Sequence, residues 1–192
     1  NGVANITKAG STQTSKGITG LVDPQTRVIS TTHKDVRVVN VYVPNGQAIG
    51  SEKFDYKLDW LEHLKKMLKD DLKKHPKMVV LGDFNIAPSD QDVHDPEKWK
   101  DKILCSAQER VLFEEILSLG FKDSFRLFEK GAGFHSWWDY RTAAYTKELG
   151  LRIDLLLISD ELEPLCKKSY IDEKPRWLEK PSDHTPVVIE LS

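Results

Sequence analysis

The chain has 192 residues, and its 28 basic and 30 acidic side chains give a formal net charge of −2. This balance excludes a protein that holds nucleic acid by overall positive charge, so a site for a polyanion has to be a local patch. The length fits one α/β domain that spans residues 1–192.

Cysteine content and apolar runs limit the cellular context. Cys105 and Cys166 are far apart and lack metal-ligand spacing, which excludes a disulfide framework and a cysteine-based zinc site. No apolar run is long enough to span a membrane, so we expect no membrane partner. The sequence starts at Asn1 without a signal-peptide pattern, and we expect an intracellular chain that is incomplete at its start.

The first half of the chain predicts a strand, a helix and a second strand. Residues 36–43 are rich in β-branched side chains and are followed by Pro44-Asn45-Gly46, which is typical of a strand that ends in a loop. Leucines recur at helical spacing from Leu58 to Leu72, with lysines on the polar positions between them. The apolar run at residues 78–81 predicts a short buried strand.

The second half predicts a loop, a helix and two more strands. Residues 86–104 are polar and predict a long surface loop. Ser106 and Glu109 have the spacing of a capping box and predict the start of a helix. Apolar residues at 151–158 and 186–191 predict further strands. Strands that alternate with helices, without an internal repeat, predict an α/β fold.

The tetrapeptide Gly82-Asp83-Phe84-Asn85 directly follows the predicted strand 78–81. On an extended backbone, Asp83 and Asn85 point to the same side, so two oxygen-bearing side chains converge. Hard divalent cations such as Mg²⁺ prefer oxygen ligands, which favours a metal site. Asp, Asn and Gly are also common in turns, so an Asx turn is the alternative. The tetrapeptide alone does not decide between them.

Asp154 is a carboxylate inside an apolar run, where burial without a partner is costly. Arg152 offers a structural ion pair, whereas Ser182-Asp183-His184 offers a chemical partner. A carboxylate that is hydrogen-bonded to an imidazole fixes the tautomer of the ring and raises its basicity, as in hydrolytic enzymes. Asp154 and His184 therefore form our candidate dyad, with a histidine satisfied in a turn as the simpler alternative.

Five segments carry a resemblance that covers nearly the whole chain. They are, in order, Asn40-Val41-Tyr42-Val43-Pro44-Asn45-Gly46, Gly82-Asp83-Phe84-Asn85, Ser136-Trp137-Trp138-Asp139-Tyr140-Arg141, Leu151-Arg152-Ile153-Asp154-Leu155-Leu156 and Lys180-Pro181-Ser182-Asp183-His184. This ordered set resembles the successive motifs of the exonuclease III type abasic-site endonucleases, in the endonuclease/exonuclease/phosphatase superfamily.

The resemblance implies a four-layered α/β sandwich of two packed mixed sheets flanked by helices. It implies hydrolysis of the DNA phosphodiester on the 5′ side of an abasic site, with 3′–5′ exonuclease and 3′-phosphatase activities. The implied cofactor is Mg²⁺, with Mn²⁺ as the alternative, and the implied partner is double-stranded DNA with abasic sites or 3′ ends. We expect action in a bacterial cytoplasm, or in the nucleus or an organelle of a eukaryote.

The resemblance also implies catalytic roles. Asp83 would position or deprotonate the attacking water, and Asn85 would stabilise the phosphoryl charge. His184, oriented by Asp154, would contact the scissile phosphate, and the phenol oxygen of Tyr42 would lie near the leaving group or the metal. Together these groups supply what phosphodiester hydrolysis requires. How proton transfer divides among Asp83, His184 and Tyr42 stays open.

Metal and DNA contacts follow from the same resemblance. The implied metal ligands are Asp83, Asn85, Asp183 and His184. The implied DNA contacts are Trp137, Trp138, Arg141 and Asn45. Trp137 would line an apolar pocket that accepts a flipped-out sugar without a base and excludes a normal nucleotide by size. Core packing is the alternative for Trp138, and an ion pair with Asp139 is the alternative for Arg141.

The sequence departs from the family at its start. The family begins with strands that end in Trp-Asn and in Gln-Glu, whose Asn and Glu bind the metal, and we find no such strand ends here. We expect the first strands to be missing and the chain to begin at a Gly-Val-Ala strand, residues 2–4, that Asn5 interrupts. We expect a monomer unless a second chain supplies these strands.

Two other functions stay open. A fragment or a degenerate homologue would bind DNA without turnover. A superfamily phosphatase that acts on a non-nucleic substrate shares the Gly-Asp-x-Asn and Ser-Asp-His elements. The Trp-Trp-Asp-Tyr-Arg block at residues 137–141 favours DNA over such substrates.

Overall fold

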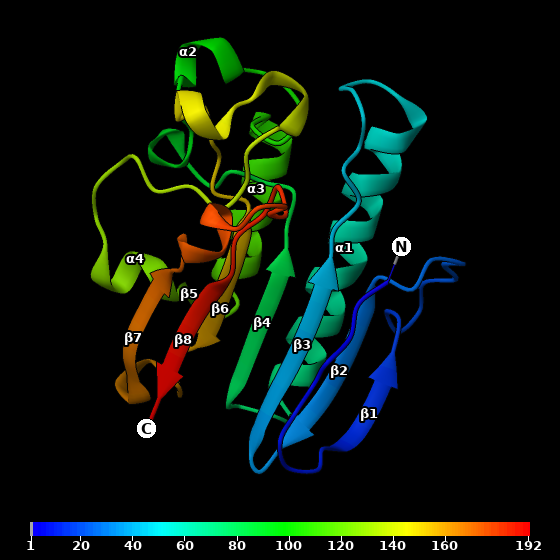
Figure 1. Ribbon diagram of the computed structural model, residues 1–192. Helices are drawn as coiled ribbons and strands as arrows, with labels where there is room; N and C mark the ends of the chain where they lie inside the picture. Colours follow the sequence, from blue (N-terminus) through cyan, green and yellow to red (C-terminus); the bar gives the residue numbers. More distant parts are fainter. Residues whose placement is uncertain (1) are drawn as a thin grey trace.

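Two β-sheets form the frame of the molecule, a computed structural model that describes residues 2–192 (Figure 1). The large sheet has six strands in the order β1-β2-β3-β4-β6-β5, and the small sheet pairs β7 with β8. The strands are β1 (Thr12–Lys16), β2 (Val28–His33), β3 (Val36–Tyr42), β4 (Met78–Asp83), β5 (Phe121–Asp123), β6 (Asp154–Ser159), β7 (Cys166–Ile171) and β8 (Val187–Leu191).

Four α-helices connect the strands, and two of them are long. They are α1 (Glu52–Leu72), α2 (Pro96–Trp99), α3 (Ala107–Leu117) and α4 (Ser124–Phe128). Single 3₁₀ turns are η1 (Asp90–Asp92), η2 (Tyr140–Thr142), η3 (Tyr145–Lys147), η4 (Glu163–Leu165) and η5 (Lys174–Trp177). Ser51 caps α1, and Ser106 with Glu109 forms the predicted capping box of α3. No helix within residues 2–192 has the length and apolar character that crossing a bilayer requires.

The central strands β3 and β4 are parallel and are joined through α1, whereas the other neighbours in the large sheet are antiparallel. Alternate residues of the central strands face opposite layers. Val80 and Leu157 pack with α1 and α3, while Val79 and Leu156 pack toward the small sheet. The face of β3 toward α1 is buried and its other face only partly so, whereas the apolar run of β4 has buried side chains on both faces.

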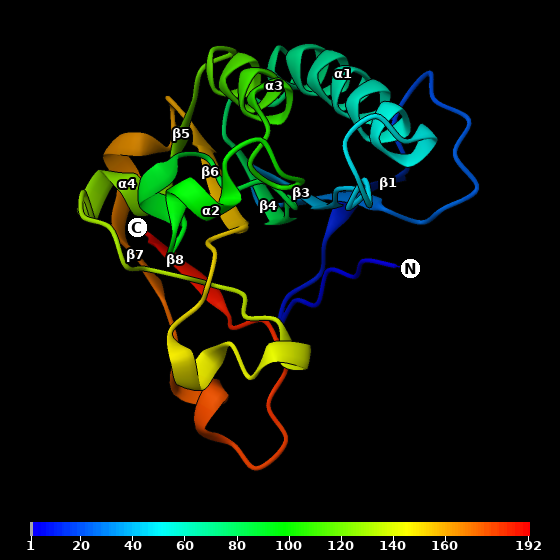
Figure 2. The same cartoon turned by 90° about the horizontal axis from the view of Figure 1, so that it is seen from above.

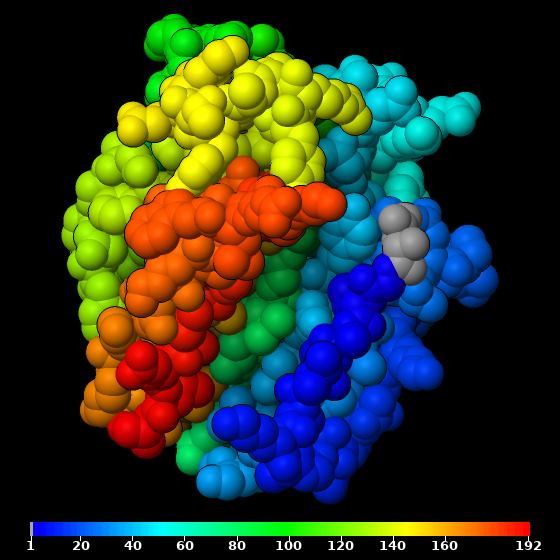
Figure 3. Space-filling model, viewed as in Figure 1, coloured from blue at the N-terminus to red at the C-terminus, as the bar shows by residue number. Residues whose placement is uncertain are grey.

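The layers are visible from above: α1 and α3 cover one face of the large sheet, and β7 and β8 lie on the other (Figure 2). The α/β class and the two packed sheets are therefore confirmed. Helices flank the large sheet, and the short α4 lies beside β7 of the small sheet (Figure 2). Between β8 and the N-terminal segment, β3 and β4 stay visible in a hollow (Figure 3) lined by side chains that include Val36, Val38, Val79, Leu81 and Ile189.

Several predicted boundaries are wrong. The strand predicted at 151–158 begins only at Asp154, because Leu151 instead bridges to Trp137 and Val93. The loop predicted at 86–104 contains η1 and α2, and its Asp92 is buried in ion pairs. Residues 2–4 form no strand.

Strands β1, β2, β5 and β7 were not predicted. Every residue of β1 is exposed and β5 has only three residues, so neither has a distinctive hydrophobic pattern. The sequence of β2 is Val-Ile-Ser-Thr-Thr-His. Because its second half is polar, the sequence did not indicate a strand that pairs with β3.

Candidate active site

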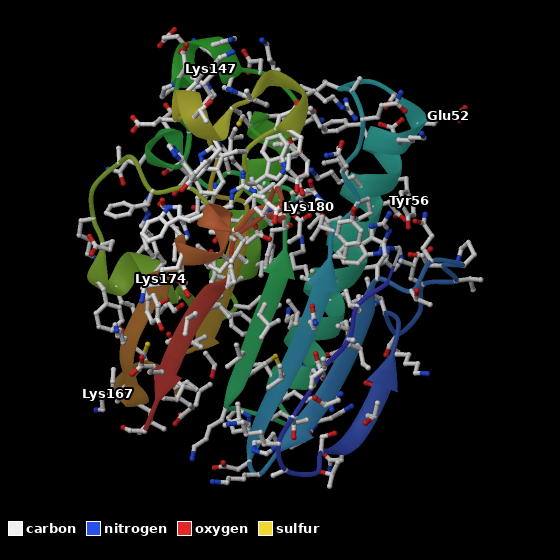
Figure 4. All side chains as sticks on the ribbon, in the orientation of Figure 1. Glu52, Tyr56, Lys147, Lys167, Lys174 and Lys180 are labelled. Carbon is white, nitrogen blue, oxygen red and sulfur yellow. The ribbon has the colours of Figure 1, made fainter. Side chains whose placement is uncertain are left out.

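Three polar residues form a row across the end of the large sheet. Tyr42 is the register partner of Asp83 between parallel β3 and β4, and Asp83 is the partner of Asp154 between antiparallel β4 and β6. By strand alternation their side chains share the face that looks toward the small sheet. Many side chains gather above the carboxyl ends of β3 and β4, where Lys180 is labelled (Figure 4).

A close backbone approach fixes the position of Asp83. The preceding Gly82 has φ +134°, and a Cβ added there would lie 2.0 Å from the carbonyl oxygen of Val41 on β3. Only glycine fits this position, because any side chain would collide with the backbone of the neighbouring strand. Gly82 therefore brings the ends of β3 and β4 together beside the row.

Asp83 and Asn85 do converge, but for a different reason from the one predicted. Asn85 has φ +49°, so the chain leaves the extended conformation and turns back. Its backbone N–H donates to Asp83 Oδ1 at 2.9 Å, and its side-chain Nδ2 donates to Asp83 Oδ2 at 3.0 Å and to the Val43 carbonyl at 3.0 Å. The Asx turn and the convergence of the two side chains are thus one structure.

The bonds of Asn85 change the role expected for it. Its Nδ2 group uses its donors on Val43 and Asp83, and its Oδ1 accepts from Asn45 Nδ2 at 3.1 Å. The side chain is buried and holds Asp83, so support of Asp83 is a role that the sequence did not reveal, while the expected contact with a phosphoryl group or a metal stays a prediction.

The predicted dyad is present in the geometry. Asp154 Oδ2 lies 2.9 Å from His184 Nδ1, at the loop that leads into β8. The same oxygen accepts a hydrogen bond from Ser136 Oγ at 2.7 Å. Ser136 Oγ in turn accepts the backbone N–H groups of Ile153 and Asp154 at 3.0 and 2.9 Å. Ser136 therefore orients Asp154, a role that the sequence did not reveal although the residue stands in the quoted aromatic block.

Arg152 does not pair with Asp154. Its Nε donates to Asp92 Oδ1 and its Nη2 donates to Asp123 Oδ2, both at 2.6 Å, in a buried cluster on the opposite side of the chain. This arrangement leaves Asp154 free for His184. The structure thus decides between the two partners that the sequence left open.

Charges in the row shift two pKa values. Burial, together with the negative charge of Asp154, raises the pKa of Asp83 to about 7. Burial disfavours the charged form of His184, but the hydrogen bond and charge of Asp154, with Asp83 and Asp183, outweigh it and raise the pKa of His184 to about 8. Near neutral pH the site therefore holds a carboxyl group that can take up a proton and an imidazole that is largely protonated.

Trp137 is placed between the dyad and Asp183. Its indole Nε1 donates to Asp183 Oδ2 at 3.2 Å, and its ring centroid lies 6.4 Å from that of His184. It is half-buried against the cluster around Leu151 and Ile153, so one part of the ring remains accessible. The position of the Trp137 ring at the edge of the candidate site fits an aromatic wall beside a small ligand.

Trp138 is corrected from a DNA contact to a core residue. It is 3 % exposed and packs edge-to-face on Tyr145 at 5.1 Å, with the guanidinium of Arg176 5.4 Å from its ring. Its burial favours the core-packing alternative.

The other two residues predicted to bind DNA are exposed. The Asp139 carboxylate accepts the backbone N–H of Arg141 at 2.9 Å, and no ion pair joins the two side chains in the described part of the chain. Asn45 follows β3, and its side chain reaches Asn85. Arg141 thus keeps a free guanidinium at the surface.

Tyr42 is held by a residue that the sequence analysis did not single out. The guanidinium of buried Arg27 lies 4.7 Å from the centre of the Tyr42 ring, and its Nη1 donates to the Tyr42 carbonyl at 3.0 Å. An arginine packed on the ring and on the backbone fixes the direction of the phenol. The isolated Arg27 in a polar stretch gave no pattern that could have indicated this role.

The model of the endonuclease/exonuclease/phosphatase family matches residues 15–184. The chain belongs to this family. Among its relatives, exodeoxyribonuclease III of Haemophilus influenzae is 33% identical over 203 residues, which cover 99% of this chain and 76% of that protein. An exodeoxyribonuclease of Bacillus subtilis is 34% identical, and the chain spans 66% of its length. Within the family the chain is thus of the exonuclease III type.

Solved structures of the family agree. The 3′ phosphatase NExo from Neisseria, bound to a product DNA hairpin, is 45% identical with a TM-score of 0.94, and the match covers 96% of this chain and 72% of that one. An AP endonuclease from Archaeoglobus fulgidus is 35% identical with a TM-score of 0.89 and coverage of 95% and 71%. Each of these proteins is longer than the matched part.

Members of the family depend on a divalent metal, so we tested whether the residues present can hold one. No three His, Cys, Asp or Glu side chains within residues 2–192 converge on a point that could hold an ion. Asp183 Oδ2 accepts from Trp137, and Asn85 is satisfied by protein groups. Asp83 and Asp183 offer the oxygen donors that a hard divalent cation prefers, and the four-ligand set of Asp83, Asn85, Asp183 and His184 stays a prediction.

Proposed function

We propose that the chain acts as a DNA-repair nuclease that hydrolyses phosphate esters at DNA 3′ ends and on the 5′ side of abasic sites. One observation carries the proposal: Tyr42, Asp83 and Asp154 form a row, with His184 held on Asp154. The relatives support DNA as substrate, since they are named exodeoxyribonucleases and AP endonucleases and one structure holds a DNA hairpin.

Asp83 is the group we assign to the attacking water. As a carboxylate held by two hydrogen bonds from Asn85, it has a fixed direction and accepts a proton from the water as the new P–O bond forms. Its raised pKa makes it a stronger base than an ordinary aspartate, while a fraction remains ionised near neutral pH. The orientation by Asn85 contributes because catalysis depends on a fixed attack geometry.

His184 is the group we assign to the phosphoryl oxygens. Its Nδ1 is engaged by Asp154, which leaves Nε2 to donate a hydrogen bond to the phosphate. The protonated ring opposes the negative charge that develops in the transition state. The phenol of Tyr42, directed by Arg27, then assists the departing oxygen from the other end of the row.

Trp137 supports a preference for small ligands at the site. An aromatic wall beside the dyad accepts a sugar without its base, because such a sugar costs little to unstack. A complete nucleotide needs more room. We therefore include abasic sites among the substrates, with Mg²⁺ as the ion used and Mn²⁺ as its replacement.

A substrate comparison tests the proposal. Three labelled duplexes that carry one abasic site, one 3′-phosphate or one recessed 3′ end are incubated with the chain, with Mg²⁺, Mn²⁺ or a chelator. We expect incision 5′ to the abasic site and release of 3′-phosphate with either ion, and neither with the chelator. A folded chain that processes none of the three contradicts the proposal.

A second candidate is a DNA-binding protein without turnover. The incomplete set of metal ligands within the described chain favours it, because hydrolysis in this family needs the ion. It predicts that the chain binds an abasic duplex with equal affinity in Mg²⁺ and in chelator, and that no product appears over long incubation.

A further inference from the structure

A lysine is completely buried beneath the candidate site. Lys57 lies on α1, and its side chain has no exposed area. Its ammonium group forms an ion pair with the buried carboxylate of Glu109 on α3. It also donates to the carbonyl of Asn85 at 2.7 Å and to the carbonyl of Asn45 at 3.2 Å. One cation thus joins two helices and the two loops that follow β3 and β4.

Both carbonyls belong to residues that support Asp83. Asn45 Nδ2 donates to Asn85 Oδ1 at 3.1 Å, and Asn85 Nδ2 donates to Asp83 Oδ2 at 3.0 Å. The ammonium group of Lys57 thus binds the backbone of the two residues whose side chains lead to the carboxylate of the row. The residue in the middle, Asn85, has φ +49°, a left-handed conformation that asparagine tolerates but that needs stabilising contacts.

Glu109 holds the other side of the ammonium group. Its carboxylate accepts from the backbone N–H of Leu104 at 3.1 Å and of Ser106 at 2.9 Å, and from Ser106 Oγ at 2.6 Å. The carboxylate is therefore fully hydrogen-bonded in a place without water. Lys57 is clamped between this fixed anion and the two loop carbonyls.

Packing alone does not explain a lysine here. Burying a charged pair costs desolvation, and apolar side chains of similar volume are often as stable or more stable in such positions. A methionine would fill the space beside Gly46, where the Lys57 stem already lies 3.0 Å from the position of an added Cβ. What an apolar side chain cannot do is donate to the carbonyls of Asn45 and Asn85.

We infer that Lys57 is a positioning residue for hydrolysis: its ammonium group holds the carbonyls of Asn45 and Asn85 so that the Asn85 side chain keeps Asp83 in its reactive direction. The inference rests on the proposed function and names a residue that acts from behind the row without touching the substrate. Because the ammonium acts through Asn85, its effect depends on the Asn85 side chain.

The test uses a charge-neutral double variant and a matched control. Lys57→Met with Glu109→Gln removes both buried charges, and the amide oxygen of the glutamine can still accept from Ser106. Lys53→Met replaces a lysine at an exposed position one turn earlier on α1. Circular dichroism shows whether each variant is folded. For the folded double variant we expect kcat for the proposed substrates to fall about 10- to 100-fold, with KM changed less than about threefold, since misplacement of a reacting group acts on the chemical step.

A double-mutant cycle with Asn85→Ala separates positioning from general destabilisation. If Lys57 acts through Asn85, the Lys57→Met and Glu109→Gln changes reduce kcat by less than about twofold once Asn85 is alanine. An unchanged kcat in the folded double variant overturns the inference. The same fold-decrease in kcat with and without the Asn85 side chain overturns it as well.

Amide hydrogen exchange gives a readout that does not require turnover. We expect the double variant to exchange the amides of residues 84–87 at least about tenfold faster than Lys53→Met does, because the loop loses its anchor. Unchanged exchange overturns the inference even if the chain is active. Faster exchange in a chain without any nuclease activity supports the anchoring of the Asn85 loop by Lys57 and contradicts the proposed function.

Discussion

Replacing Ser136 by alanine tests how Asp154 is held. Ser136 is completely buried, and its hydroxyl makes three hydrogen bonds: it donates to Asp154 Oδ2 and accepts from the backbone N–H groups of Ile153 and Asp154. Ser136→Ala removes all three at once and adds no bulk. Two backbone donors then lose this partner, and Asp154 Oδ2 keeps only His184.

The expected cost follows from the two backbone donors. A buried polar group without a partner costs about 1–3 kcal/mol, so we expect the free energy of unfolding to fall by about 2–4 kcal/mol. For a chain of this size, a loss of about 3 kcal/mol lowers Tm by about 6–12 °C. The freed carboxylate also holds His184 less well, so we expect kcat to fall about 10- to 100-fold.

Urea unfolding and steady-state kinetics measure both effects. The matched control is Ser118→Ala at the end of α3, where the hydroxyl donates only to the exposed Glu114 carbonyl at 2.8 Å. We expect the control to change the free energy of unfolding by less than about 0.5 kcal/mol. Equal stability of the two variants, or an unchanged kcat in Ser136→Ala, would refute the assignment of Ser136 as the support of Asp154.

Three further predictions concern pH, charge and metal. Burial lowers the pKa of His135 to about 4, so the unfolded chain takes up this proton more readily, and stability is lost as pH falls below the ordinary pKa of 6.5. Asp83 and His184, with raised pKa values, shift stability the opposite way, so urea unfolding gives the contribution of His135 as a difference: between pH 7.5 and pH 5 the native chain should lose about 2 kcal/mol of stability relative to His135→Gln. Arg152→Met leaves the buried carboxylates of Asp92 and Asp123 without this partner. The free energy of unfolding should fall by about 3–5 kcal/mol. A Tm within about 2 °C of that of the native chain contradicts this expectation. A chelator should stop hydrolysis of a 3′-phosphate duplex, and added Mg²⁺ should restore it; full activity in chelator contradicts the metal requirement.

The sequence predicted the elements whose hydrophobic pattern is set by burial. Strands β3, β4 and β8 and helices α1 and α3 have regular apolar spacing, because each presents a defined face to the core. Strand β1 is exposed at the edge of the large sheet, so its pairing with β2 leaves no apolar pattern. The late start of β6 depends on the bridge between Leu151 and Trp137, which only the folded chain creates.

The site was predictable where a charged residue interrupts an apolar run. Asp154 was such a case, and the cost of its burial indicated a partner. The choice of His184 over Arg152 depended on Asp92 and Asp123, which approach Arg152 from distant parts of the sequence. Supporting residues gave no such signal, since Lys57 is one of many lysines on α1.

The most direct test compares the native chain with Asp83→Asn on a duplex that carries one 3′-phosphate, in Mg²⁺, with both proteins shown to be folded. The account predicts that the native chain releases phosphate and that Asp83→Asn binds the same duplex but is slower by at least about a thousandfold, because it lacks the base that accepts the proton of the water. Equal rates for the two proteins would contradict the role given to the row of Tyr42, Asp83 and Asp154.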